Sequence, residues 1–334
     1  MFIETIFALT HNVAVLFGFT LNLYLLFLAF FKTPKSMKTY SLLVINFAVA
    51  DLFACFTDFM TEDRVIPAKE TIAYISFGPC RQAGPYTCWV LFSLLLTCLT
   101  HSLFSLLYSF YYRYRILFVN SPSQTRVFIS LLLIMVPSVC QTFGYIMSYA
   151  DPESVRRKIE HEFPAYNLTG LTITGFKDLN NFIAWIPILN CVLLLPCVYI
   201  GIVFFRHKII RFLKEHSAGM SVESRRIHSQ LLLVLTYQSF VPGCMLMGMG
   251  LFALGMVGIH GETIEYCTMI FNVLMPVLSP LSYICFLGPY KKFTLSLFNR
   301  VNNRTVPREN IVPMSNITRT QSGICPTEIY ISFH

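Results

Sequence analysis

The chain has 334 residues, of which 55% are hydrophobic and only 13% are charged, and its formal net charge is +8. Soluble domains carry about 25% charged residues, so water alone would not solvate the surface of a chain with this composition. The 31 phenylalanines and 17 tyrosines also exclude disordered, collagen-like and disulfide-scaffold chains, which leaves a polytopic membrane protein.

Long stretches without Asp, Glu, Lys or Arg predict seven membrane-spanning helices in an all-α bundle. A helix needs about 20 residues to cross the hydrocarbon core, and the continuous apolar runs do not alternate as barrel strands do. After a short extracellular segment over residues 1–7, the spans cover roughly 8–31, 39–60, 86–112, 127–150, 182–205, 228–257 and 266–288. The first run is expected to be a signal anchor, since no basic leader precedes it.

Residues 289–300 follow the last span and predict a short amphipathic helix on the cytoplasmic leaflet. Tyr290, Phe293 and Leu297 fall opposite Lys291, Lys292 and Arg300 at helical spacing. The polar stretch 301–334 is expected to be a disordered cytoplasmic tail.

The distribution of lysine and arginine predicts the orientation of the bundle. One set of alternate loops, together with the segment after the last span, carries 18 of the 25 basic residues, and the other set carries seven. The positive-inside rule therefore places the first set in the cytoplasm and the N-terminus outside. The net positive charge then describes a face beside anionic lipid, and no nucleic-acid partner is expected.

Three glycosylation sequons constrain this orientation further. The sequon at Asn167 lies in a loop predicted to be extracellular, whereas those at Asn303 and Asn316 lie in the tail. Three spans separate the loop from the tail, so only one set can be glycosylated. The basic-residue bias favours Asn167.

Most of the 11 cysteines are expected to be small apolar packing residues inside spans. Six positions belong to this group: Cys98, Cys140, Cys191, Cys197, Cys244 and Cys285. Cys80 and Cys88 differ, because both fall at the outer mouth of the third span, in an oxidising compartment. A bridge between them, a bridge to Cys267, and free thiols all remain open.

Asp51 is the most informative polar residue, because a carboxylate in mid-span needs partners inside the bundle. Asn22, Asn46 and Ser279 are candidate members of an intramembrane polar switch around it. The alternative is a structural knot of hydrogen bonds that joins helices. Asp58 lies nearer the outer face and is expected to reach water.

Prolines recur inside the spans and predict kinks about which helices can pivot. They are Pro137, Pro187, Pro196, Pro242, Pro276 and Pro280. Receptors and transporters both use such kinks, so this pattern alone does not choose between them.

Three stretches carry a resemblance to a known family. They are Phe77-Gly78-Pro79-Cys80 through Cys88, His101-Ser102-Leu103 through Ser109-Phe110-Tyr111-Tyr112-Arg113-Tyr114, and Ser224-Arg225-Arg226-Ile227-His228-Ser229-Gln230-Leu231 with Leu235-Thr236-Tyr237-Gln238 and Pro242. On these stretches the chain resembles the class delta (Srd) nematode serpentine chemoreceptors, within the seven-transmembrane G-protein-coupled receptors. Taken alone, the aromatic and arginine residues after Ser109 would be ordinary membrane-interface anchors.

The match to the broader rhodopsin-like pattern is partial. Arg113 resembles the third-helix arginine that contacts the G protein, but Tyr112 replaces its acidic partner. Pro280 through Tyr283 resembles the seventh-helix motif with Ser279 in place of Asn, and Phe240 stands where a tryptophan would precede Pro242.

The resemblance implies an olfactory-type chemosensory receptor in the plasma membrane of sensory cilia. It would bind a small molecule between the outer halves of the helices and signal to a heterotrimeric G protein. The span directions would bring eight residues to that cavity: Trp89, Phe92, Trp185, Asn190, Met245, Met249, Phe252 and Asn272. Tyr112, Arg113, Tyr114, Arg225 and Arg226 would face the G protein, and Pro242, Pro280 and Tyr283 would form the hinge.

Other classes remain as rivals or are set aside. A secondary transporter would also use prolines and a buried Asp51, although no internal repeat supports it. An odorant-gated channel of inverted orientation conflicts with the basic-residue bias. No catalytic or metal-binding motif is present, so the sequence predicts neither an enzyme nor a cofactor.

Overall fold

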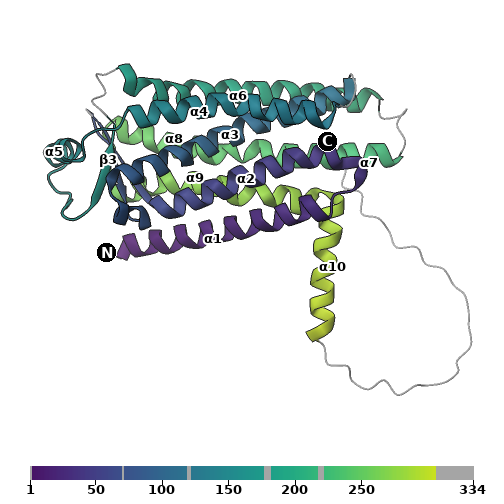
Figure 1. Ribbon diagram of the computed structural model, residues 1–334, viewed down its shortest axis with the longest axis horizontal. Helices are drawn as coiled ribbons and strands as arrows, with labels where there is room; N and C mark the ends of the chain where they lie inside the picture. The colour runs from purple at the N-terminus through teal and green to yellow at the C-terminus, as the bar shows by residue number, and fades with distance from the viewer. Residues whose placement is uncertain (1, 70, 119–121, 177–181, 217–221, 306–334) are drawn as a thin grey trace, which may run out of the picture. The chain divides into compact units, whose positions relative to one another are not determined.

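The computed structural model describes residues 2–69, 71–118, 122–176, 182–216 and 222–305. Residues up to Thr294 form one unit, a helical bundle with a small sheet at one end, and a second unit starts at Leu295. The bundle helices are α1 (Phe2–Phe31), α2 (Lys38–Thr61), α3 (Pro85–Phe118), α4 (Gln124–Met147), α6 (Phe182–His216), α7 (Val222–Phe240), α8 (Pro242–Met256) and α9 (Glu262–Phe286). Figure 1 shows them running side by side.

The helices of the bundle have the length and hydropathy of membrane spans. Within the described residues, six helical stretches meet both criteria, with α7 and α8 forming one stretch, His228–Met256. The 35-residue α6 contains the charge-free run 182–205 and is the remaining helix of the seven. Large apolar side chains such as Leu16 on α1 and Leu133 on α4 are exposed, as a lipid-facing surface requires.

The two ends of the bundle differ in composition. The sheet end holds the start of α1 and three strands, and the basic end holds the helix ends that carry most of the lysines and arginines of the described bundle. The sheet end is the one that the basic-residue bias predicts to be extracellular. Because α1 begins at Phe2, residues 2–7 belong to this helix and do not form a separate segment.

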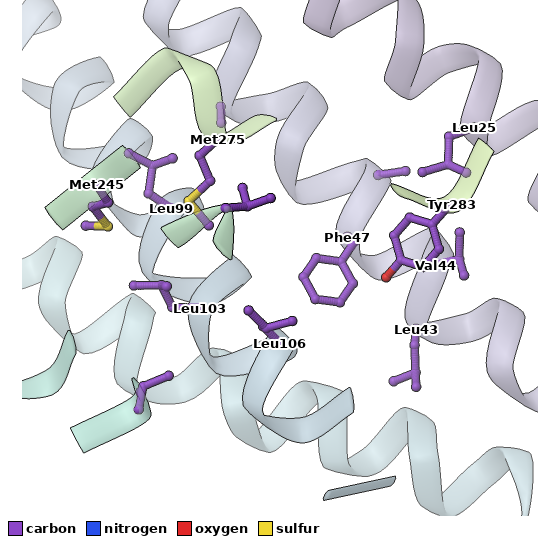
Figure 2. Packing of buried hydrophobic residues seen from close by; sticks show 14 of the residues in the cluster. Leu25, Leu43, Val44, Phe47, Leu99, Leu103, Leu106, Met245, Met275 and Tyr283 are labelled. Carbon is purple, nitrogen blue, oxygen red and sulfur yellow. The ribbon is translucent and has the colours of Figure 1, made fainter. Parts of the chain in front are cut away.

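The core lies along α3, which packs against α2, α4 and α6. Leu99, Leu103 and Leu106 of α3 are buried in it. Figure 2 shows this part of the core, with Phe47 of α2 beside the ring of Tyr283 of α9, their centroids 6.2 Å apart. Tyr283, which was predicted to belong to the hinge, is therefore a fully buried residue of the core.

The three-stranded sheet is a finding that the sequence analysis did not predict. Strands β1 (Asp63–Pro67), β2 (Ile72–Ser76) and β3 (Thr172–Gly175) pair antiparallel in the order β1-β2-β3. Each strand has at most five residues and is almost wholly buried. Strands this short do not stand out from their loops when the search is for runs of about 20 apolar residues.

Short helices complete the two outer connections. The 3-10 helix η2 (Pro79–Ala83) links the sheet to α3, and α5 (Pro152–Glu162) packs Val155 and Ile159 near Ile173 of β3. Gly78 precedes η2 and approaches the end of α2 so closely that a Cβ there would clash with the backbone of Met60. No other residue fits this contact without moving α2.

Pro242 separates α7 from α8, as its predicted role as a hinge requires. The interruption is confined to Val241, whose N–H bonds to the carbonyl of Gln238 at 3.2 Å. Proline lacks the N–H that would continue the ladder, so the helix must restart at this point.

The helix after the last span is longer than predicted. The 3-10 helix η1 (Lys35–Met37) precedes α2, and α10 (Gly288–Thr305) follows α9 and passes the predicted limit at residue 300. Tyr290 donates or accepts a 2.7 Å hydrogen bond with Thr33, and Lys32 lies 4.3 Å from the ring of Phe293. The predicted disordered tail lies outside the described residues from position 306 onward.

The cysteines divide into packed and surface positions. Cys98 and Cys244 are half-buried, whereas Cys140, Cys197 and Cys285 are exposed on the bundle surface. These last three lie within spans, as predicted, but on the surface of the bundle and not packed between helices. Their small apolar side chains tolerate a lipid-facing position, which hydropathy alone does not distinguish from the core. The side chain of Cys191 lies outside the described residues.

Candidate functional site

A cavity of about 120 Å³ lies at the sheet end, inside the bundle. The sheet contributes Val65, Ile72 and Tyr74, and Phe176 follows β3. The helices contribute Phe92, Leu96, Tyr145, Met245, Gly248, Met249, Phe252, Thr268, Met269 and Asn272. The lining is largely apolar and aromatic with few polar groups, as in many small-molecule sites.

Asn272 is the polar group best placed to orient a ligand in this cavity. Its Nδ2 donates to the carbonyl of Thr268 at 3.3 Å, one turn earlier on α9. Its Oδ1 is buried and accepts no hydrogen bond from the described residues. An unsatisfied buried carbonyl costs free energy, so a hydrogen-bond donor delivered by a ligand would be favoured here.

Gly248 explains how α8 and α9 come together at the cavity wall. A Cβ at this position would lie 2.7 Å from the carbonyl oxygen of Thr268. Any larger residue would push α8 away from α9 and open the wall.

Aromatic rings cover the cavity from the sheet side. Tyr74 lies with its ring centroid 4.2 Å from that of Phe92, and the rings of Trp89 and Phe176 meet edge to face at 5.1 Å. Trp89 is fully buried and donates from Nε1 to the carbonyl of Tyr145 at 2.9 Å. The sheet and the outer half of α3 therefore form one packed lid.

A buried ion pair ties this lid to α9. Arg64 of β1 donates from Nε to Glu265 at 2.7 Å, and the hydroxyl of Tyr166 donates to the same carboxylate at 2.8 Å. Burial alone would lower the pKa of Arg64, but the Glu265 carboxylate outweighs it, so the pKa is raised. Burial, and then the bond to Glu265, raise the pKa of Tyr166 to about 12.

The structure brings most of the predicted ligand residues together. Phe92, Met245, Met249, Phe252 and Asn272 line the cavity, and Trp89 is buried among the aromatic rings behind it. The side chains of Trp185 and Asn190 lie outside the described residues. The sequence analysis missed the lining from the sheet, because it treated the outer connections as loops. It also did not name Tyr145 of α4.

The predicted polar switch divides into two sets of contacts. Asp51 accepts a hydrogen bond from Ser102 of α3 at 3.0 Å, with Ser279 also in interaction range. Asn46 donates to Ser105 at 2.8 Å, and its Oδ1 lies 3.1 Å from Nε2 of His101. Positions 101, 102, 105 and 109 share one face of α3 at helical spacing, which is the sequence signal that would have found these partners.

Asn22 does not join Asp51, contrary to the prediction. Its Nδ2 donates to the carbonyl of Pro276 at 2.8 Å. Pro280, four residues later, has no N–H for that carbonyl, so Asn22 satisfies the group that the proline leaves free. The residue therefore joins α1 to the kinked part of α9.

Asp58 does not reach water, contrary to the prediction. It is buried, and its Oδ2 lies 2.8 Å from Nε2 of His11 on α1. The sequence analysis counted histidine as uncharged and so overlooked this partner.

Arg113 and its neighbours occupy the basic end. Arg113 and Tyr112 are buried, Tyr114 is half-buried, and the guanidinium of Arg113 lies 5.1 Å from the ring of Tyr40. Its Nε and Nη2 have no hydrogen-bond partner in the described part of the chain. Arg226 is exposed on α7, and the side chain of Arg225 lies outside the described residues.

The structure also describes the cysteines and the glycosylation sequon that were predicted to be extracellular. A disulfide joins Cys80 to Cys88, with the Cα atoms 5.2 Å apart, while Cys267 is free. Asn167 is exposed in the loop between α5 and β3 at the sheet end.

Comparisons with known proteins identify first the class and then the family. The fold is that of squid rhodopsin, with a TM-score of 0.63 and 12% identity over 91% of this chain and 85% of that one. The family model "Serpentine type 7TM GPCR chemoreceptor Srd" matches residues 7–296. Two Caenorhabditis elegans proteins, serpentine receptors class delta-18 and delta-19, are 37% and 36% identical, each over 86% of both chains.

The chain therefore belongs to the Srd family of seven-transmembrane serpentine chemoreceptors. This confirms the resemblance found in the sequence. The family is one of receptors, not of enzymes, and the chain is a multi-pass membrane protein with a rhodopsin-like helical bundle.

Proposed function

We propose that this receptor binds a small, largely apolar molecule in the sheet-end cavity and signals to a heterotrimeric G protein. The observation that carries the proposal is the buried, unpartnered Oδ1 of Asn272 in an otherwise largely apolar cavity. The ligand that suits this lining has an apolar body and one hydrogen-bond donor, such as an alcohol.

Transmission would run from the cavity to the basic end along α8 and α9. Met245 and Asn272 line the cavity, and the break at Pro242 and the kink at Pro280 lie further along the same elements. A ligand shifts the equilibrium between two arrangements only by its difference in affinity for them. We expect the basic end to open and expose Arg113, which would meet the G protein with Tyr112, Tyr114, Arg225 and Arg226.

The family and the rhodopsin-like fold favour a receptor over the transporter and channel alternatives. We further propose that the receptor works in the plasma membrane of sensory cilia, with its sheet end outside. Glycosylation tests the orientation, since Asn167 lies at the sheet end. The variant Asn167→Gln should lose the endoglycosidase-sensitive mass shift, and Asn303→Gln/Asn316→Gln should keep it. The reverse result would invert the protein and favour the channel.

The ligand site is tested with alcohols and the methyl ethers of the same alcohols, applied to cells that express the receptor with a reporter G protein. Alcohols should activate more strongly than their ethers. Asn272→Leu should raise the concentration for half-maximal response roughly ten- to hundredfold, the cost of a lost buried hydrogen bond. Asn12→Leu is the control, because Asn12 bonds the carbonyl of Ala8 away from this cavity.

Equal responses to alcohols and ethers, or an unchanged Asn272→Leu receptor, would contradict the assigned ligand class. A response that survives in cells without the G protein would contradict the signalling route.

A further inference from the structure

A second and larger cavity, of about 440 Å³, lies at the sheet end between α1, the sheet and α9. Its lining is Glu4, Thr5, Phe7, Ala8, His11, Glu62, Asp63, Phe77, Leu171, Tyr266, Met269 and Ile270. Met269 also lines the apolar cavity, so one side chain lies between the two spaces. The second cavity differs in character, because it holds three carboxyl groups.

Two of the polar side chains in this cavity are more than nine-tenths buried and incompletely partnered. His11 uses Nε2 for Asp58, and its Nδ1 has no partner among the described residues. Asp63 accepts from Ser76 on Oδ1 at 2.6 Å, and its Oδ2 has none. Both residues line the cavity.

The cavity has an excess of negative charge. Glu4, Glu62 and Asp63 line it, and His11 is the only basic side chain among the described lining residues. Arg64 does not supply the missing charge, because its guanidinium is held by Glu265 at 2.7 Å and lies 3.7 Å from Glu262.

The surroundings of the Asp63 and Glu62 carboxyl groups favour a bound cation. Burial raises the pKa of Asp63 to about 7, against the opposing hydrogen bond from Ser76. Burial also raises the pKa of Glu62, although His11 and the exposed Arg81 oppose it. A buried carboxylate is costly unless it is paired, so a bound cation would stabilise both groups.

The walls of the cavity favour an organic cation over a metal ion. The rings of Phe7 and Tyr266 stack with centroids 5.0 Å apart, and Phe77 lies 6.0 Å from Tyr266. Aromatic rings attract ammonium groups as well as apolar bodies. In the described part of the chain, no group of three or more His, Cys, Asp or Glu side chains is arranged for a metal ion.

We propose that this cavity is a second ligand site, which binds a small protonated amine with an aromatic or aliphatic body. The ammonium group would lie between Asp63 and Glu62, and the body would pack against Phe7, Phe77 and Tyr266. The site is separate from the alcohol-type site around Asn272. It requires neither that site nor coupling to a G protein.

Benzylammonium and its neutral isostere without a hydrogen-bond donor, ethylbenzene, are the probes that test this proposal. Binding of each is measured by calorimetry on the full-length receptor in lipid nanodiscs at neutral pH. Benzylammonium should bind, and Asp63→Asn should weaken it about tenfold or more. Asn keeps an oxygen for Ser76, so this variant retains the fold, and circular dichroism checks that it does. Glu62→Gln should weaken binding less, because Glu62 is only half-buried.

Two controls separate this site from the rest of the molecule. Glu160→Gln removes an exposed carboxylate from α5, outside the cavity, and should leave binding unchanged. Asn272→Leu alters only the apolar cavity and should also leave benzylammonium binding unchanged.

Several outcomes would overturn the proposal. They are equal binding of benzylammonium and ethylbenzene, no binding of benzylammonium, or unchanged binding in folded Asp63→Asn. Loss of benzylammonium binding in Asn272→Leu would place the probe in the other cavity and would equally overturn the amine site. Failure of the alcohol responses in cells would leave this site standing.

Discussion

The two ends of the bundle treat their buried arginines in opposite ways. At the sheet end, Arg64 is held by the carboxylate of Glu265 and Asp58 by the imidazole of His11. At the basic end, Arg113 is as deeply buried but has no carboxylate within ion-pair distance in the described part of the chain. It faces the ring of Tyr40 instead.

Neutral polar groups in the basic half are also incompletely bonded, as Asn272 is at the sheet end. Gln238, Tyr40 and Tyr283 are buried in the basic half, and their polar side-chain atoms make no hydrogen bond of normal geometry within the described chain. Such groups lose their bonds to water without full replacement. An arrangement of the helices that offers them partners would therefore gain hydrogen bonds.

The contrast indicates which end moves. A paired buried charge resists separation, because each partner would be left uncompensated, whereas an unpaired one gains from rearrangement. We infer that the sheet end is the fixed frame around the cavities and the basic end is the part that rearranges. The predictions below test that division, from the largest expected effect on stability to the smallest.

Glu265→Ala should destabilise the receptor most, by about 3–5 kcal/mol, because it removes the buried partner of Arg64 and leaves only the longer contact to the exposed Glu262, at 3.7 Å. Thermal unfolding of the purified receptor measures the loss. Glu160→Ala, which removes an exposed glutamate from the same end, should change stability by less than about 0.5 kcal/mol. Equal melting temperatures for the two variants would show that the sheet end is not held by this pair.

Asp63→Asn should change how stability depends on pH. The pKa of Asp63 is raised to about 7 in the folded chain, so the stability it contributes is full below its unfolded pKa and is lost as pH rises towards 7. The asparagine variant does not titrate there. Its stability relative to the unmodified chain should therefore rise by about 2–3 kcal/mol between pH 5 and pH 8.

Melting temperatures of the two proteins across this pH range give that difference. Glu62, Asp58 and His11 lie close to Asp63 and are unchanged in both proteins, so their contributions cancel in the comparison. A difference that stays constant with pH would refute the account of Asp63.

Loss of the Cys80–Cys88 disulfide should cost about 2–3 kcal/mol, less than the loss of Glu265, because the bridge closes a loop with a sequence separation of only 8. Cys80→Ala/Cys88→Ala should lower the melting temperature without changing the response to ligand. The control is Cys140→Ala, an exposed free cysteine, which should leave both unchanged. A lost ligand response at intact surface expression would mean that the loop takes part in binding.

Arg113→Met should have the smallest effect on stability, within about 1 kcal/mol, because it replaces an unpaired buried charge by an apolar chain of similar length. Signalling should nevertheless be abolished at normal surface expression. Arg226→Met, an exposed arginine at the same end, should weaken signalling less. Normal signalling from Arg113→Met would remove Arg113 from the proposed contact with the G protein.

The bundle was predictable from the sequence because a helix in lipid must be apolar over its whole length, which leaves long charge-free runs. The direction of each span then placed Met245 and Asn272 at the correct end. The strands were not predictable by the same reasoning, because β1 and β2 are five residues each and lie between charged loops. The cavity lid that they form was therefore missed.

Pairings between distant residues were the other part that the sequence did not predict. Asn22 bonds a carbonyl 254 positions away that a proline sets free, and a list of polar residues does not show this. His11 and Asp58 lie on different helices, and nothing in either stretch identifies the other as its partner. In both cases, the contact depends on the relative rotation of two helices, which hydropathy does not determine.

Spin-label distances at the two ends test most directly whether the basic end moves against a fixed sheet end. One pair of labels would be placed at the exposed positions Lys38 and Arg226, and a second pair at the exposed positions Tyr86 and Val257. Adding nucleotide-free heterotrimeric G protein should lengthen the first distance and leave the second unchanged. A change at Tyr86 and Val257 with none at Lys38 and Arg226 would contradict the account.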